Sequence, residues 1–313
     1  MKQNNNMKNI ICPCCHQRYT KEYLTLCSKK QLQSSWGVIT GNRIIYHCLS
    51  CDVRFANSVF DSEKNDDRLY NHEYHNSMAG QSTQDEKRSG LIEQSLERLN
   101  LIKHLKSSGN LLDIGSSTGL FLQYAQNNFN IFGIEPSDFA CKKARNRLGK
   151  NAVIENSGIL QSQIIFSESF DIITLWDVIE HFRDVDTALK KIVDSIKPNG
   201  IILIRTPDIT SIFFQIALIA YSLSFKKFDY PVLSIFHADH HYFFSKKSLV
   251  NLLQRHSLKI VSIQSDPLLW KRFKYCECHR GFFINFALSL LYWVGRFFGK
   301  GHGIIIIGQK NCQ

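Results

Sequence analysis

The chain has 313 residues, of which 44% are hydrophobic and 21% charged, a composition typical of globular proteins with a substantial core. Its net charge of +11 favours anionic partners: nucleic acid, phosphorylated small molecules or an acidic membrane surface. No run of about 18 uncharged apolar residues occurs, which argues against a membrane-spanning helix. The first residues, MKQNNNMKN, lack the apolar centre of a signal peptide, so we expect a cytoplasmic chain whose cysteines are thiols or metal ligands.

Two C-x-x-C pairs, separated by 32 residues, lie near the start of the chain. Paired thiolates of this kind hold tetrahedral zinc, which can organise a segment that has no core of its own. We therefore expect a zinc-ribbon-like module with a structural zinc ion over residues 1–60. Its expected ligands are Cys12, Cys15, Cys48 and Cys51. His16 and His47 are alternative ligands, and the polar residues 61–90 are predicted to form a linker or an active-site flap.

The rest of the chain alternates between strand and helix patterns. The predicted helices are 91–105, 119–127, 138–148, 184–196 and 245–256. The predicted strands are 111–114, 131–135, 152–155, 171–175, 201–205, 258–263 and 303–307. This alternation predicts an α/β fold, with a Rossmann-like, mostly parallel sheet of seven strands and helices on both faces. Ligands of such a sheet bind beyond the carboxyl ends of the strands.

The first of these strands runs into a glycine turn, LLDIGSSTG, that leads into a helix. Gly115 can adopt the backbone angles of a tight turn, and amides at the helix start face a bound ligand. Glu135 ends the next strand, where a carboxylate can accept hydrogen bonds from both hydroxyls of a ribose. Ser117 stands where the dinucleotide fingerprint has its second glycine. We therefore expect a ligand with a nucleoside but no pyrophosphate.

Five segments, in chain order, resemble the class I S-adenosylmethionine-dependent methyltransferases: LLDIGSSTGLFL, IFGIEPSDFA, FDIITLWDVIEHFRD, IKPNGIILIRTPD and HHYFFS. The similar enzymes are bacterial small-molecule methyltransferases, many of which act on sugars or cell-surface glycans. The resemblance covers about residues 91–263, and one subgroup also shares the cysteine-rich start. Ser117 departs from the family's usual glycine, and Asp239 replaces an arginine.

The resemblance implies where S-adenosylmethionine binds. The turn at Gly115 is expected to hold its methionine part and Glu135 its ribose, while residues at the end of the fourth strand line the pocket. The candidate cofactor-binding residues are Asp113, Gly115, Ser117, Gly119, Glu135, Trp176 and Asp177.

Methyl transfer from a sulfonium is an in-line displacement, so the protein mainly supplies positioning and, for a hydroxyl acceptor, a base. His181 is the predicted base, because the ordinary pKa of histidine lies near neutral pH. The candidate catalytic residues are His181, Glu180 and His240. Two alternatives stay open: Glu180 and His181 form a structural pair, or they bind a divalent cation together with Asp177. Related quinone-pathway O-methyltransferases carry a similar acidic-x-x-Glu-His pattern.

Two apolar stretches, 212–225 and 282–298, lie close to lysine and arginine residues. The second falls within an expected basic and apolar insertion at about 265–302 of the methyltransferase domain, which spans 91–313. Apolar helices with basic flanks favour the interface of an anionic membrane, so we expect peripheral contact with its inner face. The alternative is a helix packed on the sheet or in a dimer interface.

The sequence therefore predicts a methyltransferase of a small molecule or glycan, and a hydroxyl of a cell-surface or carrier-linked saccharide is the leading acceptor. An RNA methyltransferase that binds RNA through its zinc module is one alternative, since CPCCHQ resembles the start of some ribosomal-RNA methyltransferases. No nucleic-acid partner is favoured, however, because residues 10–60 contain only six lysines and arginines. A non-catalytic, zinc-bearing assembly protein is the other alternative.

Overall fold

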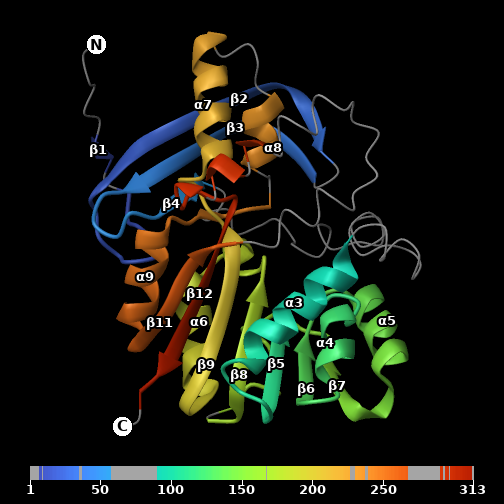
Figure 1. The fold of residues 1–313 in the computed structure, drawn as a ribbon. Coiled ribbons are helices and arrows are strands. Elements are labelled where there is room, and N and C mark those ends of the chain that lie inside the picture. Colours follow the sequence, from blue (N-terminus) through green and yellow to red (C-terminus); the bar gives the residue numbers. More distant parts are fainter. Residues whose placement is uncertain are drawn as a thin grey trace.

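The computed structural model describes residues 7–8, 10–34, 37–57, 90–166, 168–225, 230–236, 239–266, 290–291, 293–295 and 297–311. Within them, the larger of two sheets has seven strands in the order β11-β12-β9-β8-β5-β6-β7 (Figure 1). The five strands from β9 to β7 are parallel, and β12 runs antiparallel to β9 and β11. Their bounds are β5 Asn110–Ile114, β6 Asn130–Ile134, β7 Ala152–Glu155, β8 Phe170–Trp176, β9 Ile196–Pro207, β11 Leu258–Ser265 and β12 Gly303–Lys310. The predicted fold class is confirmed.

Helices cover both faces of this sheet. One face packs against α3 (Leu91–Lys103), α4 (Leu120–Ala125) and α5 (Asp138–Leu148), and the other against α6 (Val185–Ser195) and α9 (Lys246–Arg255). The central strands β5 and β8 are nearly continuous apolar runs because side chains on both of their faces are buried. Short 3-10 turns follow α5 (η3, Gly149–Asn151) and β8 (η4, Ile179–His181).

Capping residues fix where several of these helices begin. The side chains of Ser137, Asp184 and Ser245 accept the amide hydrogens of Ala140, Thr187 and Ser248 at the first turns of α5, α6 and α9. Each side-chain oxygen satisfies a backbone N–H that the helix itself leaves unpaired. The predicted bounds of α5 agree with the structure, whereas α4 is shorter than predicted and ends at Ala125.

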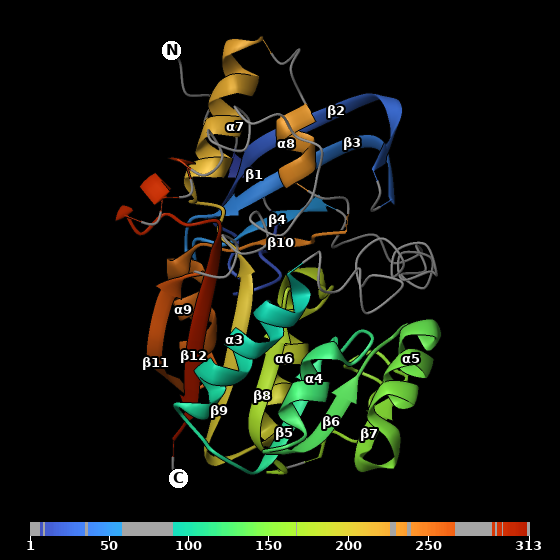
Figure 2. The same cartoon turned by 45° about the vertical axis from the view of Figure 1, so that its right-hand side comes forward.

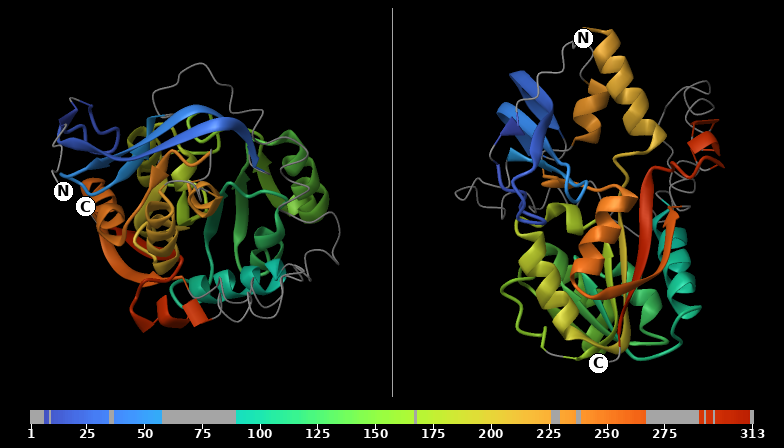
Figure 3. Two further views of the ribbon diagram at one scale, coloured as in Figure 1. Left: turned by 90° about the horizontal axis from the view of Figure 1, so that it is seen from above. Right: turned by 90° about the vertical axis from the view of Figure 1, so that its left-hand side faces the viewer.

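A smaller sheet of five described strands, ordered β1-β2-β3-β4-β10, lies over the carboxyl ends of the parallel strands (Figure 2). It is built on a long hairpin of β2 and β3, as the view from above shows (Figure 3). Its last strand comes from far along the chain, since Tyr242 pairs with Phe55. The cysteine-rich segment therefore shares a sheet with the methyltransferase part. The bounds are β1 Met7–Lys8, β2 Thr20–Ser34, β3 Gly37–Cys48, β4 Arg54–Ala56 and β10 Tyr242–Phe243.

Two helices between β9 and β10 pack on the hairpin: α7 (Ile212–Leu223) and α8 (Tyr230–Ile235). Phe214, Ala217 and Tyr221 of α7 are buried in a core shared with Leu26 and Ile45 of the hairpin. The apolar stretch that begins at residue 212 is thus a helix with one face packed on the cysteine-rich module. Among the described helices, none has both the length and the apolar character needed to cross a bilayer.

Residues 58–89, 267–289, 292 and 296 lie outside the described residues. All of the expected linker or flap at 61–90 except Gly90, and most of the expected insertion at about 265–302, fall there. The boundaries of the module, the linker and the methyltransferase domain therefore stay predictions.

Candidate functional site

The glycine turn after β5 has the conformation that its sequence requires. Gly115 has a φ of 73°, and a Cβ atom there would lie 2.5 Å from Cγ2 of Val178. The amides of Gly115 and Ser116 donate to the carbonyl of Ile134 at 2.8 and 3.1 Å, which ties the turn to the end of β6. Ser117 has a φ of 49°, so it keeps the left-handed backbone that glycine would favour.

Glu135 is the first residue after β6, and its carboxylate accepts a backbone amide of the glycine turn. Its Oε2 accepts the amide of Ser117 at 2.9 Å, and its Oε1 accepts the amide of Ser137 at 2.9 Å. Burial raises the pKa of Glu135 to about 7, against the effect of these two amides. A carboxylate offers about four acceptor positions, so the two oxygens can also accept the hydroxyls of a ribose.

Asp113 and Trp176 are two further candidate cofactor-binding residues, and they lie on the neighbouring strands β5 and β8. Oδ1 of Asp113 accepts the Thr174 hydroxyl at 2.6 Å, and burial raises the pKa of Asp113 to about 7. The centre of the Trp176 ring is 5.8 Å from that of the Phe121 ring, and Cζ of Arg98 lies over the Trp176 ring, 4.6 Å from its centre. These contacts fix an aromatic face at the carboxyl end of β8, beside the glycine turn.

Asp177 follows Trp176 and has a φ of 61°. Its Oδ1 accepts from Nη1 of Arg205, and its Oδ2 lies 3.9 Å from Nη2 of Arg98. Nε of Arg205 also pairs with the buried carboxylate of Asp266 at 2.8 Å. Because two arginines already neutralise the charge of Asp177, a role for it as a cation ligand is disfavoured.

Glu180 and His181 of η4 lie close to His240 of the segment before β10. Each brings one ligand atom to within 4.8 Å of the other two. The rings of His181 and His240 are 4.7 Å apart. The cation alternative would therefore use His240 in place of Asp177. His237, from the same segment, lies outside the described residues.

Glu180 is the acid of this group, and 1% of its surface is exposed. Its Oε2 accepts the hydroxyl of Thr206 at 3.0 Å, and its Oε1 has no hydrogen-bond partner among the described residues. Burial, assisted by the negative charge of Asp239, raises the pKa of Glu180 to about 8. This raised pKa favours the protonated form of the carboxyl near neutral pH.

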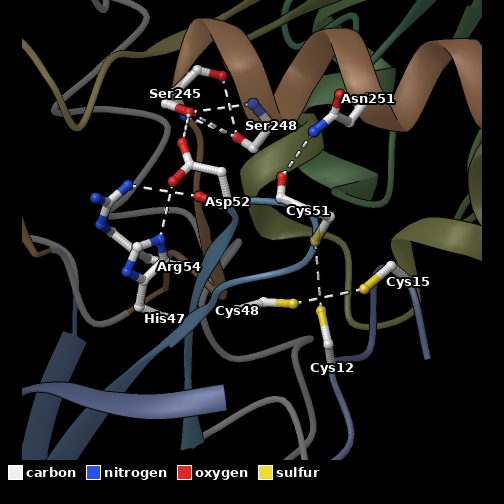
Figure 4. A network of polar contacts seen from close by, with 10 residues as sticks. All are labelled: Cys12, Cys15, His47, Cys48, Cys51, Asp52, Arg54, Ser245, Ser248 and Asn251. Atoms are coloured by element: carbon white, nitrogen blue, oxygen red, sulfur yellow. Dashed lines mark hydrogen bonds and ion pairs between the residues drawn. The ribbon is translucent and has the colours of Figure 1, made fainter. Parts of the chain in front are cut away.

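The four predicted zinc ligands form a compact cluster (Figure 4). The sulfur atoms of Cys12 and Cys51 are 3.7 Å apart, and those of Cys15 and Cys48 are 3.5 Å apart. Tetrahedral zinc with bonds of about 2.3 Å places its sulfur ligands about 3.8 Å from one another, so the cluster fits this ion.

The alternative histidine ligands have other partners. Nε2 of His16 lies 3.1 Å from Asp186, and Nε2 of His47 lies 2.9 Å from Asp52. Asp52 also accepts the hydroxyl of Ser245, which is the N-cap of α9 (Figure 4). His16 thus connects the module to α6, and His47 holds Asp52 within the module, so the four thiols are the candidate ligand set.

The module is anchored to α9. The side chain of Asn251 donates to the carbonyl of Cys51 at 3.3 Å (Figure 4), and Arg255 donates to the carbonyl of Cys14. Cysteine and aromatic side chains of the module share one buried cluster with α6, α9 and the large sheet. These described residues of the module therefore share their core with the methyltransferase part.

Sequence reasoning missed the residues that connect these parts, namely Arg43, Arg98 and Arg205. Arg43 of β3 donates to the carbonyls of Phe236 and His240, which lie more than 190 positions further along the chain. Arg98 and Arg205 lie in a predicted helix and a predicted strand, and no motif marks them. Only an arginine within an otherwise apolar strand, as at 205, hints at a buried ion pair.

A family model described as a methyltransferase domain matches residues 85–263, more than half of the chain. The ubiquinone biosynthesis O-methyltransferase of Rhodopseudomonas palustris strain TIE-1 is 27% identical over 130 residues, which are 41% of this chain and 50% of that protein. The tRNA U34 carboxymethyltransferase of Desulfotalea psychrophila is 33% identical over 125 residues, 37% of this chain and 38% of that protein. The chain thus spans half or less of the length of these curated relatives.

Among solved structures, a possible histamine N-methyltransferase from Thermotoga maritima has a TM-score of 0.47 and is 21% identical, covering 73% of this chain and 96% of its own. A methyltransferase from Mesorhizobium loti has a TM-score of 0.49 and is 12% identical, covering 70% of this chain and 100% of its own.

Proposed function

Because the chain belongs to the methyltransferase-domain family, we propose that it transfers a methyl group from S-adenosylmethionine to a hydroxyl of a small molecule or glycan. The cofactor assignment rests on Glu135. Its two carboxylate oxygens accept the amides of Ser117 and Ser137 at the carboxyl edge of the parallel strands. A carboxylate in this position suits a ribose, and the serine in the turn suits a ligand without a pyrophosphate.

The cofactor, when bound, supplies a methyl group on a positively charged sulfur. The glycine turn and Glu135 would hold its methionine and ribose parts, with Asp113, Trp176 and Asp177 beside them. His181 would receive the proton of the acceptor hydroxyl as the new C–O bond forms, because the raised pKa of Glu180 favours its protonated form near neutral pH.

The cysteine cluster supports the proposal of a structural zinc ion. The four sulfur atoms have the spacing of a tetrahedral site, and the segment that carries them depends on α9 and the large sheet for its core. Zinc would then fix the knuckles from which β3 and β4 extend over the site.

An exposed apolar surface supports the proposal of peripheral membrane contact. The side of α7 that faces away from the hairpin exposes 41% of Ile216, 57% of Ile219 and 75% of Leu223. Phe225 follows at 88%, and α7 itself contains no charged residue. The adjacent Lys226 and Lys227 would attract anionic lipids, which suits an enzyme whose saccharide acceptor is linked to a lipid carrier.

Flotation with vesicles tests the membrane contact. Wild-type protein should float with vesicles that contain anionic phosphatidylglycerol, and Ile219→Glu with Leu223→Glu should abolish this, because two charges would enter the apolar interface. Val261→Glu is the matched control, since Val261 is an exposed apolar residue on β11. Wild-type protein that stays with the soluble fraction would contradict membrane contact, and a dimer that the α7 variant disrupts would assign the surface to a second copy.

A label-transfer assay tests the acceptor class. Protein and methyl-labelled S-adenosylmethionine are incubated with host extract, which is then separated into lipid, polysaccharide, RNA and soluble pools. Label in the lipid, polysaccharide or soluble pool, lost in Glu135→Ala, is the expected result. Label in RNA would instead support the RNA alternative. No transfer to any pool would favour the non-catalytic alternative.

A further inference from the structure

Asp239 is a buried acid that the proposed methyl transfer does not use. It lies just before β10 and exposes 7% of its surface. Its Oδ1 has no hydrogen-bond partner among the described residues. A buried carboxylate is costly unless charges nearby compensate it, so its surroundings indicate what it does.

The first residue close to Asp239 is His181. Its Nδ1 lies 3.1 Å from the backbone carbonyl oxygen of Asp239 and 3.4 Å from Oδ2 of the same residue. A carbonyl oxygen can only accept a hydrogen bond, so Nδ1 carries the proton. In the neutral ring the other nitrogen, Nε2, then has the free lone pair. Asp239 thus directs the basic nitrogen of His181 away from itself.

The second residue close to Asp239 is Arg43 of the hairpin. Its guanidinium donates to the carbonyl of Phe236 at 3.1 Å and to that of His240, which lie on either side of Asp239 in the chain. Only 5% of Arg43 is exposed, and burial lowers its pKa to about 10 while the charge of Asp239 acts in the opposite direction. The arginine therefore stays charged and fixes the segment that carries Asp239.

A third contact fixes the same segment from the other side. The amide of His241 donates to the carbonyl of Glu180 at 2.8 Å, and the amide of Ala56 in β4 donates to the carbonyl of His241 at 2.9 Å. The segment 239–241 is thus held between η4, which carries His181, and the cysteine-rich module. Both the module and η4 determine where Asp239 lies.

We propose that Asp239 is a positioning residue for His181, and that Arg43 of the cysteine-rich module holds Asp239 in place. This role rests on the proposed function. As the acceptor oxygen forms its bond to the methyl carbon, the carbon–sulfur bond breaks and its electron pair stays on sulfur. The acceptor proton passes to Nε2 of His181, and the carboxylate of Asp239 balances the imidazolium. The products are the methylated acceptor, neutral S-adenosylhomocysteine and a protonated histidine.

Histidine ¹⁵N NMR tests the geometry without an acceptor, with His181→Gln to assign the signals. Wild-type protein above pH 8 is expected to show a protonated Nδ1 and a bare Nε2 on His181. In Asp239→Asn the backbone carbonyl of residue 239 still accepts from Nδ1, so the tautomer is expected to stay the same while the imidazolium loses its balancing carboxylate. A protonated Nε2 in the wild type would overturn the proposal.

Kinetics on whichever pool accepts label give the second readout. Asp239→Asn and Arg43→Met are expected to lower kcat about 10²-fold or more, because base catalysis contributes about 10²–10⁴-fold. KM and the affinity for S-adenosylhomocysteine should change less than about twofold. Asp186→Asn is the control, because it removes an aspartate–histidine pair elsewhere, with His256 at 2.9 Å. Equal loss in all three variants would assign Asp239 a merely structural role.

The two readouts separate the two proposals. If no pool accepts label but the tautomers behave as expected, the proposed function fails and the positioning of His181 stands. If label transfers and Asp239→Asn keeps the wild-type kcat, the proposed function stands and the role of Asp239 fails.

Discussion

Gly115 shows how one residue type sets the geometry of the turn. Its φ is 73°, and an added Cβ atom would lie 2.5 Å from Val178. Gly149 has a similar φ of 66° but open space around it. Gly149 combines this φ with a ψ of −152°, a region that essentially only glycine adopts, so Gly149→Ala should cost about 1–3 kcal/mol of unfolding free energy from backbone strain alone. Gly115→Ala should cost about 1–3 kcal/mol more because of the clash, and should weaken S-adenosylhomocysteine binding at least tenfold.

Urea unfolding and calorimetry measure both effects. Equal stability and equal ligand affinity in the two alanine variants would mean that the turn can move away from Val178. That result would contradict tight packing between Gly115 and Val178.

The buried acids predict how stability depends on pH. Burial raises the pKa of Asp113 and Glu135 to about 7 and that of Glu180 to about 8. Between the ordinary values near 4 and these raised values, the folded state keeps protons that the unfolded chain has lost. The stabilisation is therefore complete below about pH 4 and is lost as pH rises through 7 to 8.

Thermal unfolding of the ligand-free protein between pH 5.5 and 8.5 checks this dependence. Tm should fall across that range, and Glu180→Gln should reduce the fall by several degrees, because glutamine cannot ionise but can still accept from Thr206. A pH dependence that is the same in wild type and Glu180→Gln would contradict the buried, protonated state of Glu180.

At the residue scale, the sequence predicted only those positions that depend on neighbouring residues in the chain. Glu135 and His181 follow apolar strands, so their place at the carboxyl edge follows from counting along the chain. Asp239 and Arg43 could not be connected in this way. Their partnership depends on the small sheet bringing β3 next to a segment almost 200 positions away, and no spacing rule encodes that contact.

At the element scale, the cysteine knuckles predict a sharp contrast between neighbouring residues. Cys12 is one of four clustered sulfurs, whereas Cys14, also buried, is not among them. Cys12→Ser should lower the zinc content from about one ion per chain to near zero and lower Tm, because structural zinc contributes folding free energy. Cys14→Ser should keep its zinc.

Metal analysis by mass spectrometry and thermal unfolding measure this contrast. Zinc-free wild-type protein with the Tm of the metal-loaded form would contradict a structural site, and loss of zinc in Cys14→Ser would assign the ligands differently.

Elements with strong periodicity were predictable, and α7 shows why others were less so. The sequence IFFQIALIAYSL is apolar on all sides, so its pattern does not say which side packs against protein. In the structure Phe214, Ala217 and Tyr221 contact the hairpin, and the opposite side is exposed. The pattern predicted a helix; only the position of the hairpin decided which face it buries.

At the scale of the whole molecule, the cysteine-rich module and the large sheet share a core. Phe55 and Val53 of the module lie in one buried cluster with Leu249 of α9 and Val185 of α6. The two parts should therefore unfold together, in a single calorimetric transition that zinc removal shifts as a whole. Two separate transitions, of which only one responds to a chelator, would contradict the shared core.

The sequence pattern did not specify the order of strands in the large sheet, in which β8 lies beside β5 rather than β7. The parallel direction of its central strands was predictable, since alternating strands and helices predict parallel strands with crossover helices. The pairing of β10 with β4 was not. β10 is a two-residue strand whose apolar neighbours read as core, and its partner lies almost 190 positions earlier. Such short, non-local pairing is set by packing of the complete chain rather than by local preference.

The central claim is that Glu135 and the glycine turn bind a nucleoside cofactor. Calorimetry with S-adenosylhomocysteine tests it directly on wild type, Glu135→Ala and Asp171→Asn. Asp171 is the matched control, because its carboxylate also accepts a backbone amide, from Asn110 at 2.8 Å, but at the opposite edge of the sheet. The expected result is one site per chain in wild type and Asp171→Asn, with affinity at least tenfold weaker in Glu135→Ala. No binding by wild type, or equal binding by Glu135→Ala, would contradict it.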